Sequence, residues 1–314
     1  MRFAVGALLF ALALSVAGCS DDGSAAQVTF EPVIETPPPV SATPTATSTP
    51  IPPPELVLSA TTIPQAGAIL VSLVGTVTSG EVTFLGRTQQ LYQGSQSIYA
   101  FVGVAPDDPP GPQQLRVEFV LPNGTRGVLT QPIDVLAREW TLDEIEVPED
   151  RTGLLGPGVA EVESAIIEAV YAGQTPEKLW TNGWLIPTDG AITTQFGEQR
   201  AYNGAPPSGH HTGVDIGADE GTPVVATNSG RVVLVRELSL HGNMIIVDHG
   251  GGVFSGYSHL SGFAVSEGQL VAAGDLLGYV GNTGLSTGAH LHWEMYVGGV
   301  GVDALRFVDG SNGF

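Results

Sequence analysis

Cysteine is nearly absent from this chain, which has 314 residues and a single cysteine, Cys19. A disulfide needs two cysteines, so no bridge within the chain can stabilise it. A structural zinc site made of thiolates is excluded for the same reason. The folded part must therefore be stabilised by its buried core, and any bound metal must take nitrogen and oxygen ligands.

Basic residues are scarce as well, because 11 Lys and Arg stand against 32 Asp and Glu, which gives a formal net charge of -21. Binding to nucleic acid or to an anionic membrane surface needs a basic patch. We therefore expect no nucleic acid among the partners and no adhesion to an anionic membrane through surface charge. The charge balance does not name the substrate or any protein partner.

Long apolar segments are few, and the clearest one lies near the start of the sequence. The apolar run 3–17 is shorter than the roughly 20 residues that a membrane-spanning helix needs, and it is typical of an export signal. Residues 16–19, VAGC, resemble the lipobox that the bacterial lipoprotein signal peptidase cleaves. This pattern predicts a signal peptide over 1–18, lipidation of Cys19, and an exported protein anchored by its lipid to a membrane of the cell envelope. An ordinary signal peptide with an incidental cysteine is the alternative.

The most informative motif in the chain is a pair of histidines, His290 and His292, with one leucine between them. On a β-strand these two side chains project to the same face. Upstream, His211 and Asp215 supply a further imidazole and a carboxylate. A mononuclear catalytic zinc takes three ligands of these types and keeps one position open for water. His211, Asp215 and His292 can form such a set, which leaves His290 free for proton chemistry.

Three segments around these residues resemble those of the lysostaphin/LytM zinc endopeptidases. Segment 209–216, GHHTGVDI, is similar to their H-x-G-x-D signature, and segment 257–260, YSHL, to their Y-x-H-L. Segment 281–294, which ends in TGAHLHWE, is similar to their closing T-G-x-H-L-H-x-E stretch. The order and spacing agree over about 185–309, and Ala289 is a departure, since many relatives have proline there.

The resemblance implies a function for five residues. His211, Asp215 and His292 are the implied zinc ligands, and His259 and His290 are the implied catalytic histidines beside the metal-bound water. Which of these two histidines acts as the general base stays open. The implied catalytic domain consists of antiparallel sheets with Zn²⁺ in a groove between loops, and the implied substrate is peptidoglycan.

Four further residues near the motifs are candidates with an alternative interpretation. Tyr257 could bind substrate and steady a tetrahedral intermediate, or it could be a packing aromatic. Asn282 and Thr283 belong to a glycine-containing loop expected to line the substrate groove. Glu294 could orient a ligand histidine or lie at a strand edge facing solvent. The remaining three histidines are not expected in the site, and for His249, before a run of glycines, a hairpin turn is the preferred interpretation.

The rest of the chain divides into segments of different composition. Residues 19–54 are rich in Pro and Thr, which predicts an extended linker. Residues 55–137 contain short alternating stretches separated by turn residues such as Pro122-Asn123-Gly124, which predicts an immunoglobulin-like β-sandwich. Residues 185–314 carry the motifs, so the expected fold class is all-β, with a LytM-type antiparallel catalytic domain.

The connecting segment 138–184 is expected to contain one amphipathic helix, over 159–171. Its apolar residues recur at helical spacing, and three acidic residues are predicted to face away from the apolar side; these are Glu161, Glu163 and Glu168. The helix is expected to pack on a neighbouring domain. A segment that regulates access to the groove is the sharper alternative.

The predicted function is that of a zinc-dependent endopeptidase that hydrolyses peptide bonds in peptidoglycan stem peptides or cross-bridges during cell-wall remodelling. Three other functions compete with it. They are a non-catalytic LytM-type activator of wall amidases, a secreted protease that cuts glycine-rich proteins, and a wall-binding module without turnover. The presence of all five residues favours the enzyme, because an activator does not need them.

Overall fold

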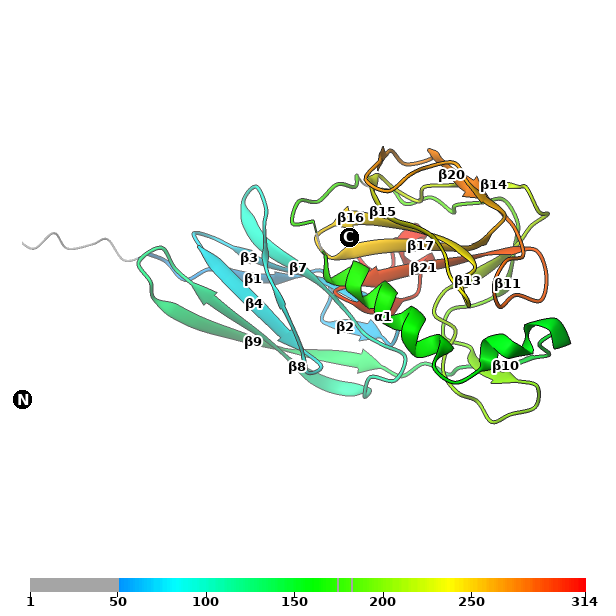
Figure 1. Cartoon of the computed structure of the whole chain (residues 1–314). Coiled ribbons are helices and arrows are strands. Elements are labelled where there is room, and N and C mark those ends of the chain that lie inside the picture. The colour runs from blue at the N-terminus through cyan, green and yellow to red at the C-terminus, as the bar shows by residue number, and fades with distance from the viewer. Residues whose placement is uncertain (1–50, 174, 182) are drawn as a thin grey trace, which may run out of the picture. The chain divides into compact units, whose positions relative to one another are not determined.

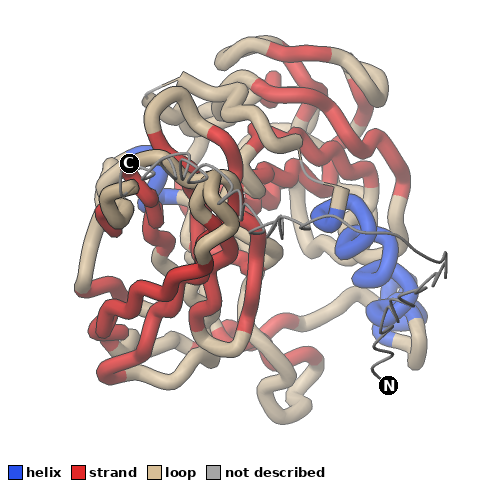
Figure 2. The backbone as a smooth tube through the Cα atoms, turned by 90° about the vertical axis from the view of Figure 1, so that its left-hand side faces the viewer, coloured by secondary structure: helices blue, strands red, loops and turns tan. Residues whose placement is uncertain are grey.

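The computed structural model describes residues 51–173, 175–181 and 183–314, all within one compact unit (Figure 1). The predicted signal peptide, the lipidation of Cys19 and nearly all of the predicted linker lie outside these residues. In the described ranges, no helix is long and apolar enough to cross a membrane. Strands make up most of the regular backbone, as Figure 2 shows, which confirms the predicted all-β class.

The elements follow one another along the chain in this order: β1 (Glu55–Leu58), β2 (Thr62–Pro64), β3 (Ala68–Val74), β4 (Ser79–Phe84), β5 (Arg87–Gln90), β6 (Tyr92–Gln93), β7 (Ser97–Gly103), β8 (Gly111–Val120), β9 (Arg126–Leu136), β10 (Leu142–Ile145), η1 (Glu149–Leu155), α1 (Val159–Ala172), β11 (Ala191–Thr194), β12 (Gln199–Tyr202), β13 (Val214–Gly217), β14 (Pro223–Val225), β15 (Gly230–Glu237), β16 (Asn243–Gly250), β17 (Val253–Leu260), β18 (Gly262–Phe263), β19 (Leu270–Val271), β20 (Leu276–Tyr279), β21 (His290–Val297), β22 (Val300–Val302) and α2 (Leu305–Val308).

The first nine strands form two sheets, with strand orders β1-β3-β7-β6 and β2-β9-β8-β4-β5. Their alternating residues point into a shared apolar core that includes Ile69, Val71, Val117 and Ile133, as expected of two sheets packed face to face. The hairpin β8–β9 turns at the predicted Pro-Asn-Gly site, where Gly124 has a positive φ of 82°. The predicted β-sandwich is therefore present.

The C-terminal part is built on an eight-stranded sheet of order β11-β13-β21-β17-β16-β15-β19, with β22 paired to β21. Its central strands β16, β17 and β21 are buried almost throughout, because both of their faces are covered. In the register, Asp215 of β13 lies opposite His292 of β21, and His292 lies opposite Ser258 of β17. Three strands thus meet at the place where the predicted ligands lie.

Helix α1 has the predicted bounds to within a residue, but the predicted solvent-facing side is wrong at Glu163. This side chain is only 3% exposed, whereas Val162 on the expected apolar side is 66% exposed. Glu163 is buried together with Ile167 and Tyr171, which pack against the sheet residue Phe254. A buried carboxylate is tolerated where hydrogen bonds replace water, and a hydrophobicity pattern contains no information about such partners.

The connecting segment is an integral part of the folded unit and does not behave as a free spacer. Strand β10 pairs in parallel with β12, and Trp180 and Trp184 lie in the main core of the C-terminal part. The ring of Phe101, on β7 of the sandwich, lies 5.2 Å from that of Trp180 and 4.7 Å from that of Phe314. Residues from the sandwich, the connecting segment and the C-terminal sheet therefore share one apolar core.

Candidate active site

The three predicted ligand residues converge at the end of strands β13 and β21. The Nε2 atom of His211 lies 2.8 Å from Nδ1 of His292 and 3.0 Å from Oδ1 of Asp215. The Nδ1 atom of His292 lies 2.8 Å from the same carboxylate oxygen. All three residues are buried, and their donor atoms form a group that could hold a metal ion. The structure thus brings together residues 81 positions apart in the chain.

The outer atoms of the two imidazoles are already engaged. His211 Nδ1 donates to the carbonyl oxygen of Gln195 (2.9 Å), and His292 Nε2 lies 3.2 Å from Oε1 of Glu294. The lone pairs of both rings therefore point at each other and at the Asp215 carboxylate. This crowding of electron-donating atoms requires a proton or a cation among them, so the donor set fits a divalent metal.

The protonation equilibria of the three residues agree with that requirement. Burial lowers the pKa of His211 to about 4, so this ring is neutral near pH 7. Burial also lowers the pKa of His292, but hydrogen bonds to Asp215 and Glu294 outweigh this effect and raise it. A raised pKa means that His292 binds a proton more tightly beside Asp215, and a metal ion would compete with that proton for the same lone pair.

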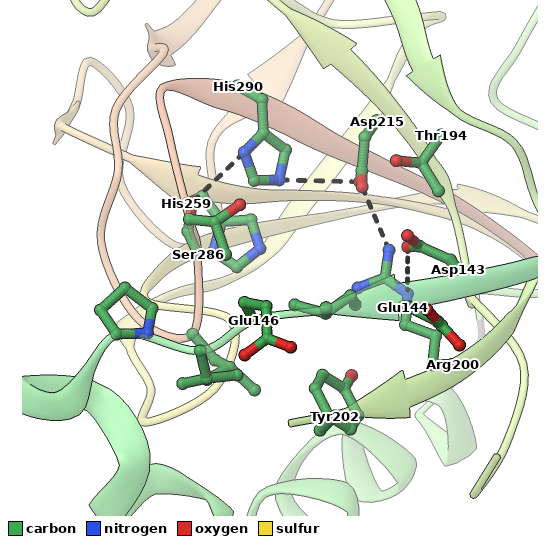
Figure 3. A pocket seen from close by; sticks show the side chains of 15 residues that line it. Asp143, Glu144, Glu146, Thr194, Arg200, Tyr202, Asp215, His259, Ser286 and His290 are labelled. Atoms are coloured by element: carbon green, nitrogen blue, oxygen red, sulfur yellow. Dashed lines mark hydrogen bonds and ion pairs between the residues drawn. The ribbon is translucent and has the colours of Figure 1, made fainter. Parts of the chain in front are cut away.

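His259 and His290 lie beside this group, with ring centroids 4.7 Å apart (Figure 3). His290 Nδ1 donates to the carbonyl of Gly288 (2.9 Å) and its Nε2 lies 3.7 Å from Oδ1 of Asp215. His259 Nδ1 donates to the carbonyl of Thr283 (2.8 Å). Burial lowers the pKa of both rings. Each ring is therefore neutral near pH 7 and keeps Nε2 available as a proton acceptor.

A β-bulge places His259 on the site. Strand β17 pairs Leu260 with Asn243 and Tyr257 with Ile245, so β17 has one more residue than β16 between these two pairs. His259 takes a positive φ of 61°, which is uncommon for a residue other than glycine. A bulge reverses the alternation of side chains along a strand, so His259 and Tyr257 do not point to the same side.

Tyr257 is consequently a core residue, which corrects its predicted part in substrate binding. Its ring is fully buried and its hydroxyl accepts a hydrogen bond from the N–H of Thr227 (2.9 Å). The same hydroxyl lies 2.9 Å from Oγ of Ser255. The packing interpretation therefore replaces the one in which the phenol contacts the reaction centre, and the reason is the bulge two residues further on.

Asn282 and Thr283 lie in the loop between β20 and β21, and Thr283 holds the ring of His259 by a hydrogen bond. Thr283 accepts from His259 through its carbonyl, and its hydroxyl donates to the carbonyl of Leu260 (2.9 Å). Asn282 Oδ1 accepts a hydrogen bond from Arg151 of η1 (3.1 Å). The cavity walls nearby come from Leu285 and two residues that follow it, so direct substrate contact by Asn282 or Thr283 stays a prediction.

A cavity of about 260 Å³ opens next to the histidines. Asp215, His259 and His290 form one wall, and the connecting segment 143–148 forms part of the opposite wall (Figure 3). Arg200, on β12, donates from its guanidinium to Oδ2 of Asp215 (3.1 Å). Segment 143–148 and Arg200 were not predicted as part of the site, because no local sequence motif indicates that β10 pairs with β12.

Sequence reasoning also missed His241. Its Nδ1 lies 2.5 Å from Oε1 of Glu163, and its Nε2 lies 3.7 Å from Oε1 of Glu294. Burial alone would lower the pKa of His241, but these two carboxylates raise it to about 10. Glu294 is only 1% exposed and also accepts from the hydroxyl of Thr212 (2.6 Å). Of the two interpretations of Glu294, orientation of His292 is the one its position supports.

The other two histidines have partners of their own, although His210 lines a cavity together with His211 and His292. His249 is buried near the end of β16, where its ring lies 2.8 Å from the carbonyl of Ser229 and 2.8 Å from Oγ of Ser255. The predicted hairpin turn follows it directly, between β16 and β17. His210 Nδ1 lies 2.7 Å from the carbonyl of Gly197. Both histidines therefore have structural partners outside the site.

A close crossing of two loops holds the carbonyl that accepts from His259. A Cβ atom on Gly242, which has a positive φ of 61°, would lie 2.3 Å from Oγ1 of Thr283. We expect Gly242→Ala to reduce the free energy of unfolding by about 1–3 kcal/mol, as overpacking does, and to lower turnover because Thr283 must move. Denaturant unfolding and kinetics measure both effects. Gly262→Ala is the control, since nothing surrounds its Cβ within 4 Å, and equal effects from the two changes would contradict this account.

The fold and the site together define a class of protein. Two imidazoles and a carboxylate, buried at the end of a sheet beside an open cavity, form the kind of donor set that mononuclear catalytic zinc sites use. Two further neutral histidines at the same cavity supply proton acceptors. The donor set and the two further histidines are therefore of the kind that metal-dependent hydrolases use.

Comparison with known proteins places the domain in a family. Residues 209–304 match the model of peptidase family M23, so the chain contains an M23 peptidase domain. A solved structure of a putative peptidase M23 from Pseudomonas aeruginosa is similar at a TM-score of 0.58, with 26% identity over 78% of this chain and 93% of that one. The fold likeness thus extends well beyond the matched 209–304.

Two curated relatives are similar over the C-terminal part. The peptidoglycan DD-endopeptidase ShyA of Vibrio cholerae is 36% identical over 37% of this chain and 27% of its own length. The murein hydrolase activator NlpD of Salmonella dublin is 34% identical over 44% of this chain and 34% of its own length. The chain spans about a quarter to a third of the length of these relatives, and their names include both an enzyme and an activator.

Proposed function

We propose that this protein is a zinc-dependent endopeptidase that hydrolyses peptide bonds in the stem peptides or cross-bridges of peptidoglycan. The observation that carries the proposal is the convergence of five residues on one place, where Asp215, His259 and His290 line a cavity and His211 and His292 complete the donor group behind it. Three of them, His211, Asp215 and His292, would hold the zinc ion, and His259 and His290 flank the open side. The similarity to ShyA, whose name states a peptidoglycan DD-endopeptidase, supports the substrate class.

The zinc site and the two further histidines would have different roles in the hydrolysis. When bound, zinc supplies a polarised carbonyl and a water molecule whose pKa falls from about 15.7 towards 7. His259 and His290 accept a proton at Nε2 because their Nδ1 atoms are committed to backbone carbonyls. The ring that takes the proton can pass it to the leaving amine. Desolvation lowers the pKa of both rings and so keeps them in the neutral, accepting form.

A second candidate function has one observation in its favour, the similarity to the activator NlpD. An activator of wall amidases works through protein contacts and needs neither an intact ligand set nor the two further histidines. This chain has all five residues in a mutually consistent geometry. The enzyme is therefore the function that we favour, and the activator is the outcome to test against it.

The proposed location follows from the substrate and from the start of the sequence. We propose that the protein is exported and lipid-anchored through Cys19, so that the folded unit reaches peptidoglycan from a membrane of the envelope. The Pro-rich stretch 19–54 would serve as the spacer. Metabolic labelling with a radiolabelled fatty acid, compared between the natural chain and Cys19→Ser, tests this proposal, and equal labelling of both would contradict it.

Digestion of purified peptidoglycan tests the enzymatic function. We expect the purified protein to release soluble muropeptides with new peptide termini, and a zinc chelator to abolish the release, because the ligand set would be emptied. Mass analysis of the products names the bond. If the protein binds zinc but releases no muropeptides, and if it stimulates an added wall amidase, the activator function would replace the endopeptidase function.

A further inference from the structure

Helix α1 lies outside the matched 209–304 segment, yet one of its side chains reaches towards the metal group. Glu163 is buried, and its Oε2 accepts a hydrogen bond from the N–H of Leu240 (2.8 Å). Its Oε1 accepts from the N–H of His241 (2.9 Å) and lies 2.5 Å from Nδ1 of the same residue. One carboxylate thus fixes two successive backbone amides and the imidazole ring of His241.

The ring that Glu163 holds in place, that of His241, also contacts Glu294. The Nε2 atom of His241 lies 3.7 Å from Oε1 of Glu294, which itself lies 3.2 Å from Nε2 of His292. The rings of His241 and His292 are 6.0 Å apart. A carboxylate that is 1% exposed needs positive charge nearby to stay in place. The ring of His241 lies between Glu163 and Glu294, and this position links the two carboxylates.

We propose that Glu163 is a positioning residue for the metal centre, which holds His241 so that Glu294 in turn orients His292 for zinc. The inference deepens the proposed function, since it rests on His292 as a zinc ligand. Partners of this kind fix the tautomer and direction of a ligand histidine, and their loss typically costs about 10–100-fold in metal affinity or activity. Glu163 lies two residues further out than Glu294, the direct partner of His292, so we expect a smaller effect.

The same three residues, His241, His292 and Glu294, also form a second group whose atoms could hold a metal ion. The positioning role is the one that the contacts of Glu294 favour, because its Oε1 already accepts from the hydroxyl of Thr212 (2.6 Å) and lies 3.2 Å from Nε2 of His292. Counting the zinc ions in the purified protein separates the two interpretations. One ion agrees with positioning, and a second ion that is lost on changing Glu163 would overturn it.

The deciding experiment compares Glu163→Gln with Glu161→Gln in the purified protein. Both changes remove one negative charge from α1, but Glu161 is exposed. Zinc affinity is measured by competition with a chelator, and the ligand field by the visible spectrum after cobalt substitution. We expect zinc to bind about three- to tenfold more weakly in Glu163→Gln, with an altered cobalt spectrum, and no change in Glu161→Gln.

A double substitution guards against an effect of lost stability alone. If Glu163 acts through His241, the variant Glu163→Gln/His241→Gln should bind zinc no more weakly than the weaker single variant, because the two residues belong to one chain of contacts. Additive losses, or a Glu163→Gln variant equal to Glu161→Gln, would overturn the inference and leave the endopeptidase intact.

The endopeptidase proposal can also fail while the positioning role of Glu163 holds. A natural chain that releases no muropeptide while Glu163→Gln still weakens zinc binding would remove the endopeptidase and keep the positioning role. A natural chain that binds no zinc would overturn both.

Discussion

Replacement of His292 by alanine is expected to abolish zinc binding and peptide release together. His292 supplies one of three ligand atoms and lies at the centre of the group, in contact with both His211 and Asp215. Its loss removes a ligand and leaves the buried Glu294 without the ring it orients. We expect turnover to fall by more than about 100-fold, beyond what the loss of an outer partner costs.

Metal analysis of the purified variant, together with muropeptide release, measures both effects. His210→Ala is the matched control, because it removes a neighbouring imidazole whose contacts are with Gly197 and Asp107. The control should keep zinc and activity. A His292→Ala protein that retains one zinc and digests peptidoglycan normally would show that the ligand set is assigned wrongly.

Replacement of His290 by alanine is expected to give the opposite combination, with zinc retained and turnover lost. His290 is not needed for the three-atom donor group, since its Nε2 lies 3.7 Å from Asp215 Oδ1. General acid–base catalysis typically contributes about 10²–10⁴-fold, so we expect kcat to fall within that range. The zinc content should equal that of the natural chain.

His259 needs a different substitution from His290. Its positive φ of 61° makes alanine a strained replacement, whereas asparagine tolerates this conformation. We therefore expect His259→Asn to remain folded and to lose turnover as His290→Ala does. If both variants digest peptidoglycan at the natural rate, the two histidines have no part in the reaction.

The site could be predicted to the extent that its residues lie in contiguous motifs. Spacing alone put His290 and His292 on one face of a strand, and the ligand atoms of His292 and Asp215 do meet, 2.8 Å apart. The face of Tyr257 could not be predicted, because one extra residue in β17 reverses the alternation. Nothing in the local pattern signals such a bulge.

The supporting residues escaped sequence reasoning for a different reason. Glu163 and His241 are 78 positions apart, and each is unremarkable in its own segment. Glu163 even agrees with the polar side of an amphipathic helix, which is why it was predicted to be exposed. Only the tertiary structure brings the imidazole of His241 to this carboxylate, and the burial of Glu163 then requires such hydrogen-bond partners. Fold class depends on composition and periodicity, so it was the easier prediction.

The shared core of the three segments bears on how such a chain can be inherited. Phe101, Trp180 and Trp184 contribute to the core beneath the sheet that carries the ligands, and all three lie outside 209–304. A recombination event that copied 209–304 alone into another gene would carry every proposed ligand and both proposed acid–base histidines. It would leave behind the aromatic rings that cover the sheet. The segment that matches the family model is therefore shorter than the set of segments that share this core.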